Sequence, residues 1–138
     1  MIRYASAYLA SGVVFLTLDL AWLSFASQRL YRPLIGELLA SSIALGPALL
    51  FYAVYVGGIV ALAVTPALRG GSWLRAARYG AVLGLVAYGT YDLTNQATLR
   101  TWATRLTLLD MSWGLVATAI AASAGLLAAR AVGGLGPE

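Results

Sequence analysis

The stretch YASAYLASGVVFLTLDLAWLSFAS, residues 4–27, decides the fold class, because Asp19 is its only charged residue. A run of about 20 apolar residues is long enough to cross the hydrocarbon core of a membrane as an α-helix. In lipid such a segment must be helical, because a lone strand would leave its backbone hydrogen bonds unmade. Residues 4–27 therefore predict a transmembrane helix with one acid inside it.

Three further apolar runs follow, at approximately residues 46–65, 73–95 and 106–129. Together the four runs predict an all-α, polytopic integral membrane protein, a four-helix transmembrane bundle with up-down-up-down topology and short loops. We expect one domain over residues 1–132, followed by a flexible, glycine-rich tail over residues 133–138. The composition agrees, since only 10% of the residues are charged, whereas a soluble domain carries about a quarter.

Two linkers hold apolar residues and suggest interfacial segments. In residues 28–45 the leucines and isoleucine after Pro33 have helical spacing, which predicts a small interfacial helix beginning near this proline. Residues 96–105 suggest a second interfacial stretch. Trp73 and Trp102 flank the third run and are typical of anchors at a membrane boundary.

The residue types that are missing exclude several kinds of chemistry. The chain has neither cysteine nor histidine, which removes disulfides, thiol and imidazole catalysis and the usual zinc sites. We therefore predict no metal site and no cofactor; a divalent ion held by carboxylates is the alternative that this composition leaves open. All nine basic residues are arginines scattered between the apolar runs, so nucleic-acid binding is not expected.

Three of the five acids, Asp19, Asp92 and Asp110, lie in or beside the apolar runs. An Asp at the centre of a membrane helix costs at least about 2.5 kcal/mol, so such acids are rare unless they are paired or functional. Asp19 and Asp92 lie late in helices that run the same way, and Asp110 lies early in a helix that runs back. The up-down topology therefore predicts one acidic site towards one side of the membrane.

Aromatic and polar residues surround these acids. An Asp-x-x-Trp pattern occurs twice, and its spacing of three puts both residues on one helix face. Around the third acid, Tyr88 precedes the polar run YDLTN, residues 91–95. Tyr52 and Tyr55 can face either the acids or lipid. The candidate ligand or proton site comprises Asp19, Trp22, Tyr88, Tyr91, Asp92, Thr94, Asn95, Asp110 and Trp113.

Each acid also has a purely structural interpretation. Asp19 can form an interhelical hydrogen bond, for example to a tyrosine or serine. Asp92 can cap the segment that follows the third helix. Asp110 completes a capping box that begins at Thr107. Because Asp19 has no helix end to cap, it is the strongest single functional candidate.

The motifs resemble a known family. Phe15-Leu16 followed by Asp19-Leu20-Ala21-Trp22-Leu23, the run Tyr91-Asp92-Leu93-Thr94-Asn95, and Asp110 followed by Trp113-Gly114 resemble domain of unknown function 2177 (DUF2177), a family of small bacterial membrane proteins. The resemblance spans nearly the whole chain. It implies a multi-pass protein of the bacterial inner membrane and a context of lipid modification, but no established activity or catalytic residue.

Three functions follow as hypotheses. The first is binding or transport of a small or lipophilic ligand with proton coupling. The second is a membrane-embedded enzyme or accessory subunit in lipid modification, with the acids transferring protons. The third is a structural subunit of a membrane complex. The expected partners are the lipid bilayer and a ligand, a homo-oligomer is left open, and Arg69, Arg75 and Arg78 favour an N-in/C-in orientation.

Overall fold

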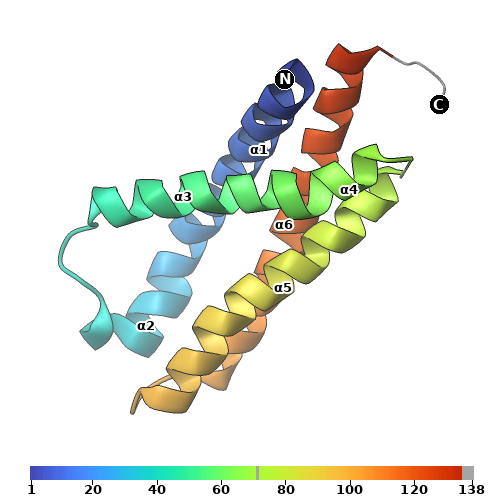
Figure 1. Cartoon of the computed structure of the whole chain (residues 1–138). Coiled ribbons are helices and arrows are strands. Elements are labelled where there is room, and N and C mark those ends of the chain that lie inside the picture. The colour runs from blue at the N-terminus through green and yellow to red at the C-terminus, as the bar shows by residue number, and fades with distance from the viewer. Residues whose placement is uncertain (71, 135–138) are drawn as a thin grey trace.

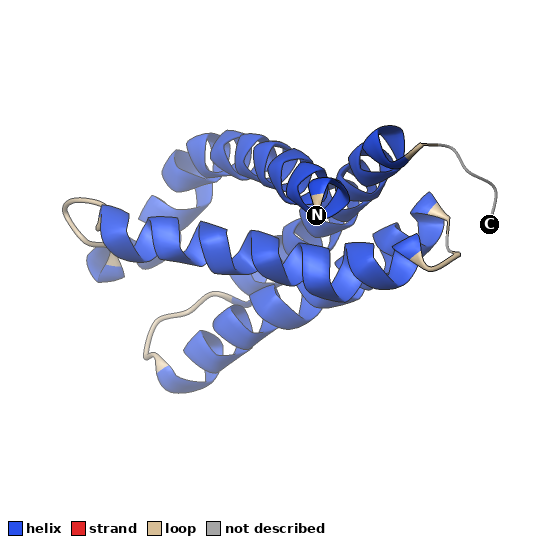
Figure 2. Ribbon diagram, turned by 45° about the horizontal axis from the view of Figure 1, so that its top comes forward, coloured by secondary structure: helices blue, strands red, loops and turns tan. Residues whose placement is uncertain are grey.

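Helices joined by short loops make up the computed structural model, which describes residues 1–70 and 72–134; no strand occurs among these residues (Figures 1 and 2). The chain forms four long helices, two of which are interrupted by π-helical turns. The first consists of α1 (Ile2–Ala26), the π turn η1 (Ser27–Tyr31), α2 (Arg32–Ile35) and the 3₁₀ turn η2 (Gly36–Leu38). The second consists of α3 (Leu45–Ile59), the π turn η3 (Val60–Val64) and α4 (Thr65–Leu68), and it is followed by α5 (Trp73–Thr98) and α6 (Thr104–Gly133).

Three of these helices are long and apolar enough to cross a membrane: Ile2–Leu38, Leu45–Leu68 and Thr104–Gly133. The fourth, α5, has 26 residues and is therefore about 39 Å long at 1.5 Å per residue. It is less apolar because it begins with two arginines and ends in a polar run. The predicted all-helical membrane bundle of four helices is confirmed.

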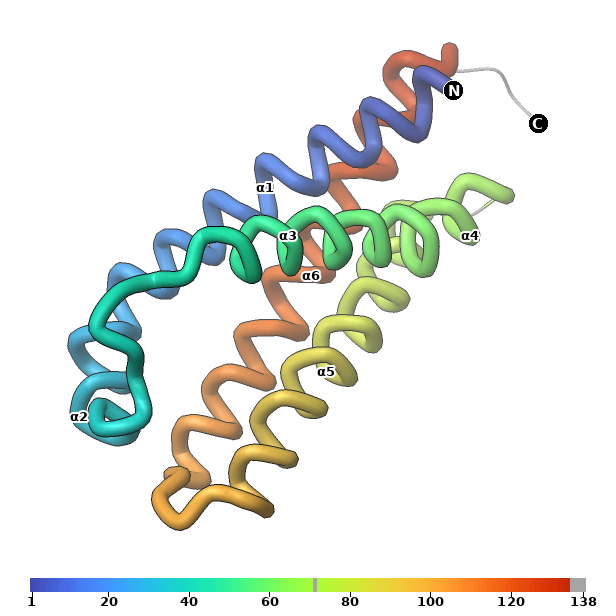
Figure 3. The backbone as a smooth tube through the Cα atoms, turned by 60° about the vertical axis from the view of Figure 1, so that its left-hand side comes forward, coloured from blue at the N-terminus to red at the C-terminus, as the bar shows by residue number. Residues whose placement is uncertain are grey.

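Helix α6 lies at the centre of the bundle. Figures 1 and 3 show α5 alongside α6. Helix α1 runs antiparallel to α6 beside its C-terminal half, and α3 crosses α1 and α6 obliquely. Small residues permit these contacts. A Cβ atom added to Gly125 would lie 2.1 Å from the Ser11 Oγ of α1, and one added to Gly84 of α5 would lie 2.1 Å from the Gly114 carbonyl oxygen.

The first and last turns of the bundle are joined directly. The Arg3 guanidinium donates from Nη2 to the carbonyl oxygen of Gly133 at 2.6 Å. Both ends of the described chain consequently lie at one end of the molecule (Figure 3). A second hydrogen bond joins α1 and α6 near the middle of their contact, where Ser11 Oγ donates to the Ala121 carbonyl oxygen at 3.0 Å.

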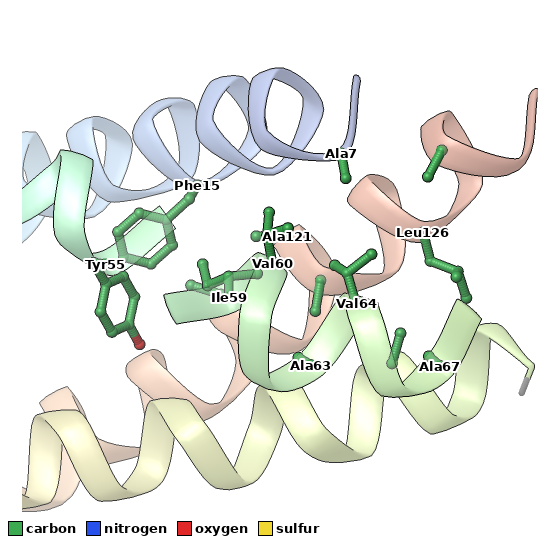
Figure 4. Close-up of a cluster of buried hydrophobic side chains, with 14 residues drawn as sticks. Ala7, Phe15, Tyr55, Ile59, Val60, Ala63, Val64, Ala67, Ala121 and Leu126 are labelled. Atoms are coloured by element: carbon green, nitrogen blue, oxygen red, sulfur yellow. The ribbon is translucent and has the colours of Figure 1, made fainter. Parts of the chain in front are cut away.

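The apolar core lies where the second helix crosses α1 and α6 (Figure 4). Phe15 of α1 packs its ring against Tyr55 of α3 with centroids 4.8 Å apart. Further along, valines and alanines of η3 and α4 meet the alanines of α6. Large rings therefore fill one part of this core, and small residues fill the part nearer the termini.

The linkers differ from the sequence prediction. Instead of a separate interfacial helix, residues 27–38 continue α1 through a π turn, with Pro33 in the first turn of α2. Leu30 and Ile35 are buried against Leu106 of α6. The apolar side chains of this segment therefore pack against the bundle, whereas the sequence predicts that they contact the membrane interface. No helix forms between α5 and α6, because α5 runs on to Thr98 and α6 already begins at Thr104. The flexible tail predicted for residues 133–138 begins too early, because Gly133 is the last residue of α6 and accepts a hydrogen bond from Arg3. Residues 135–138 of this predicted tail lie outside the described residues.

Candidate functional site

The three acids come from three different helices. Asp19 of α1, Asp92 of α5 and Asp110 of α6 are all buried, with 7%, 0% and 4% of their surfaces exposed. The carboxyl group of Asp110 is near enough to those of Asp19 and Asp92 for electrostatic interaction with both. The structure thus brings together the acids that the topology places at one depth, in the half of the bundle away from the termini.

Asp19 has a donor on each carboxylate oxygen. Tyr52 of α3 donates to Oδ2 at 2.6 Å and Tyr88 of α5 donates to Oδ1 at 3.2 Å. This single side chain therefore links α1, α3 and α5. Tyr55, the other tyrosine whose direction the sequence left open, turns instead to α6 and forms a hydrogen bond with Thr118 at 2.8 Å.

Asp110 is held by an aromatic pair. Its Oδ1 accepts a hydrogen bond from the Tyr31 hydroxyl at 2.8 Å and another from Trp22 Nε1 at 3.2 Å. The Trp22 Nε1 also lies 3.1 Å from the Tyr31 oxygen. The indoles of Trp22 and Trp113 stack with centroids 4.9 Å apart and planes 9° from parallel. The two Asp-x-x-Trp faces therefore meet, and the tryptophan of α1 donates to the aspartate of α6.

Tyr31 reaches Asp110 because of the π turn. It follows Trp22 by nine residues, which at about 100° per residue would put the two on opposite faces of a regular α-helix. The wider turn at Ser27–Tyr31 changes this register, and the chain turns back only after α2 (Figure 3). Such turns are frequent at functional sites. Tyr31 is not predicted from the sequence as a site residue, because a helical pattern gives no signal for one inserted π turn.

Asp92 lacks the donors that the other two acids have. Within residues 1–70 and 72–134, neither of its carboxylate oxygens has a hydrogen-bond partner. The indole Nε1 of Trp113 is likewise buried and unpartnered. No arginine is among the charged groups that act on Asp92 or Asp110 in the described part of the chain. The cluster therefore has one unused buried acceptor group and one unused buried donor.

Two glycines allow α5 and α6 to approach closely beside these acids. A Cβ atom on Gly114 would lie 2.3 Å from the ring of Tyr88, so the ring that reaches Asp19 lies directly over this glycine. Gly84, one turn earlier in α5, faces the Gly114 carbonyl oxygen. The Trp113-Gly114 pair thus supplies both a stacked indole and the space for Tyr88.

The chain matches, over residues 4–127, the family DUF2177, which is described as a predicted membrane protein. It belongs to this family. The match to DUF2177 includes all three acids and every residue that donates to them. No match was found among curated proteins or among solved structures.

The remaining predicted site residues of this DUF2177 chain lie at the edge of the cluster. Tyr91 is 57% exposed, packs edge-on against Trp102, and is near enough to Asp92 and Asp110 to interact electrostatically. Thr94 is exposed and donates to the Thr90 and Tyr91 carbonyl oxygens of its own helix. Asn95 is half-buried. These residues form a rim rather than the centre.

The capping interpretations of two acids are wrong for this DUF2177 protein. Helix α6 begins at Thr104, with Ala103 as its N-cap, so Asp110 lies inside the helix. Thr107 instead accepts from Trp102 Nε1 at 3.0 Å and donates to Gln96 Oε1 at 2.8 Å. Helix α5 extends beyond Asp92, which leaves this acid no helix start to cap. The interhelical hydrogen bonds of Asp19 match its structural interpretation.

The three acids do not make a metal site among the described residues, where no three acidic side chains are grouped to hold an ion. Their chemistry is that of carboxyl groups in contact with phenols and indoles. Such groups can accept hydrogen bonds and gain or lose protons. Two of the three already have donors, and the third does not.

Proposed function

We propose that this DUF2177 protein binds a small or lipophilic ligand at the acid cluster and transports it, with uptake and release of a proton. The observation that carries the proposal is Asp92, which is fully buried and whose carboxylate oxygens both lack a partner among residues 1–70 and 72–134. Burying a polar group without a hydrogen bond is unfavourable, and burying an unpaired charge is more so. Intramembrane acids of this kind are typical of ligand and proton pathways.

A proton or a donor group of a ligand would each satisfy Asp92. Because both occupy the same oxygens, binding of one opposes binding of the other, and this competition is the elementary requirement for proton coupling. The Trp113 Nε1 of α6 is a second buried group without a partner among the described residues, and it would donate to an acceptor on a ligand that reaches it. Asp19 and Asp110, whose donors come from other helices, would hold the site in shape.

We propose that the protein lies in the bacterial inner membrane, as its family suggests, with both termini in the cytoplasm. The orientation rests on the positive-inside rule, which counts short loops most, because the loop between α4 and α5 and the first turns of α5 hold Arg69, Arg75 and Arg78. Four helices are few for a carrier, so we further propose that it works as a homo-oligomer.

A membrane-embedded enzyme, or an accessory subunit in lipid modification, is the second candidate. The observation in its favour is that Asp92 of α5 and Asp110 of α6 are both buried, on two helices that pack against each other. Two such acids with different surroundings can serve as general acid and general base. A structural subunit is the third candidate, and the hydrogen bonds of Asp19 and Asp110 across helices are what such a protein would also have.

The deciding experiment uses a deletion strain rescued by wild type, by Asp92→Asn, or by the control Glu37→Gln. The control makes the same acid-to-amide change at an exposed position. Lipid and metabolite profiles are compared after the amount of each protein in the membrane has been equalised. We expect wild type and the control to restore the profile and Asp92→Asn to fail.

The outcomes separate the candidate functions. Rescue by Asp92→Asn would leave only the structural function. If a chemically modified lipid that the wild type restores is missing from the strain with Asp92→Asn, the result would favour the membrane-embedded enzyme. Failure to move an unaltered compound would favour transport, and proteoliposomes with an imposed pH gradient would then show whether that compound accumulates only with Asp92 present.

A further inference from the structure

Two grooves lie side by side at the end of the bundle that carries the termini, away from the acid cluster. They enclose about 440 and 490 Å³ and share Gly70, which lies in the loop between α4 and α5. Arg75 and Arg78 of α5 line the first groove, and Arg3 and Arg69 line the second. Four guanidinium groups from three separate segments therefore face one small region.

Within residues 1–70 and 72–134, no acid neutralises the positive charge of this region, and no acid of these residues lines either groove. In the part of the chain that the structure describes, the side chains of Arg69, Arg75 and Arg78 make no hydrogen bond or ion pair, and Arg3 donates only to a neutral carbonyl oxygen. Ser72 lines the first groove, and its hydroxyl forms no capping bond. The groups present are donors suited to phosphate oxygens.

The same grooves have an apolar, aromatic border. Leu74 and Tyr79 line the first, and Tyr4 and Leu68 line the second. Trp73, beside them in sequence, is 57% exposed. Exposed tyrosine and tryptophan side chains at a helix end are typical of the depth at which lipid headgroups lie. A ligand with an anionic head and an apolar body would contact both kinds of residue, whereas a free anion would use the arginines alone.

We propose that these paired grooves bind the phosphate headgroup of an anionic phospholipid. Arg75 and Arg78 contact the phosphate in one groove, Arg3 and Arg69 do so in the other, and the leucines and tyrosines contact the upper acyl chain. Basic pockets between membrane helices bind lipid headgroups in this way. The inference is independent of the acid cluster and holds whichever function that cluster serves.

The test compares two pairs of arginines. The purified full chain in a neutral detergent is titrated with dioleoylphosphatidylglycerol, with dioleoylphosphatidylcholine, or with inorganic phosphate. Retained lipid is counted by native mass spectrometry, and the unfolding midpoint is measured in parallel. The variant Arg75→Gln/Arg78→Gln removes two charges from the first groove. The control Arg100→Gln/Arg105→Gln removes two exposed charges from the opposite end.

We expect phosphatidylglycerol to be retained and to raise the unfolding midpoint of the wild type and of the control. The groove variant should bind it about 25-fold more weakly, at roughly fivefold for each arginine. If that variant does not fold, Arg69→Gln in the second groove is measured instead, with about a fivefold loss expected. Phosphatidylcholine and inorganic phosphate should have no comparable effect.

Three results would overturn the proposal. An equal loss of phosphatidylglycerol binding by Arg100→Gln/Arg105→Gln would mean that the arginines act only through their total charge. Equal retention of phosphatidylcholine would mean that the grooves do not select a headgroup. Binding of inorganic phosphate as tight as that of the lipid would identify a site for the free ion.

Discussion

Asp110 and Asp92 lie within electrostatic reach of one another on the two most closely packed helices, and both are almost fully buried. Asp110 accepts hydrogen bonds from a phenol and an indole, and Asp92 accepts none in the described part of the chain. The donors of Asp110 come from α1 and its π turn, which do not supply Asp92. Burial alone therefore does not reveal which acid is functional, because what distinguishes them is the donors that surround each one.

The largest effect is expected from separating the helices that carry both acids. Gly84→Ala places a Cβ atom 2.1 Å from the backbone carbonyl oxygen of Gly114, which cannot yield without moving α6. We expect a loss of about 3 kcal/mol or more in the free energy of unfolding, visible as a lower unfolding midpoint in detergent. Gly58→Ala is the control, because no atom lies within 4 Å of its new Cβ. Equal midpoints for the two variants would contradict the close packing of α5 and α6.

Removing the satisfied acid is expected to have the next largest effect. Asp110→Ala leaves the hydrogen-bond donors of Tyr31 and Trp22 without their acceptor, which should cost about 1–3 kcal/mol of stability. Asp92→Ala removes no hydrogen bond, so the difference between the two variants isolates the contribution of the donors. Thermal unfolding of both proteins in the same detergent measures it. The comparison of the two acids fails if Asp92→Ala is the more damaging change.

Removing one donor at a time should give smaller effects. Tyr31→Phe removes the phenolic donor to Asp110 and should destabilise the protein by about 0.6 kcal/mol, the average for a hydrogen bond between membrane helices. Because Trp22 Nε1 shares that acceptor, we also expect a shift in tryptophan emission. Tyr79→Phe, at an exposed position, serves as the control. An unchanged emission spectrum would argue against the joint contact.

The smallest effect on stability is expected at Asp92 itself. Asp92→Asn keeps the shape of the side chain and removes only the charge and the titration of a group without partners. We expect the unfolding midpoint to stay the same or to rise, while the activity assayed in the deletion strain is lost. A clearly lowered midpoint would show that Asp92 has a structural partner, and the contrast with Asp110 would disappear.

The fold could be predicted from the sequence because it depends on local quantities. Runs such as residues 4–27 have the length and apolarity of a membrane helix, and the alternating directions of successive helices place Asp19, Asp92 and Asp110 at one end. The Asp-x-x-Trp spacing correctly places the Asp and the Trp of each motif on one helix face. The stacked tryptophans lie where these two faces meet.

The partners of each acid could not be predicted, because they depend on how helices cross. From the sequence, Asp19 is the first functional candidate among the acids, because it has no helix end to cap. In the structure, Tyr52 of α3 donates a hydrogen bond to Asp19, and this bond favours a structural role. Tyr31 was missed because a π turn changes the helical register without a marker in the sequence. Asp92 was assigned a capping alternative because the end of α5 was placed too early, and helix ends are the least reliable part of such predictions.

The hydrogen bond from Arg3 to Gly133 has a practical consequence for protein engineering. Because the first and last turns of the bundle are adjacent, a reporter fused to either end would report on the same compartment. Two copies could also be joined head to tail by a linker that does not cross the bilayer. A tandem of this kind, with Asp92→Asn in the first copy, the second copy or both, would count how many intact acid clusters one working unit requires.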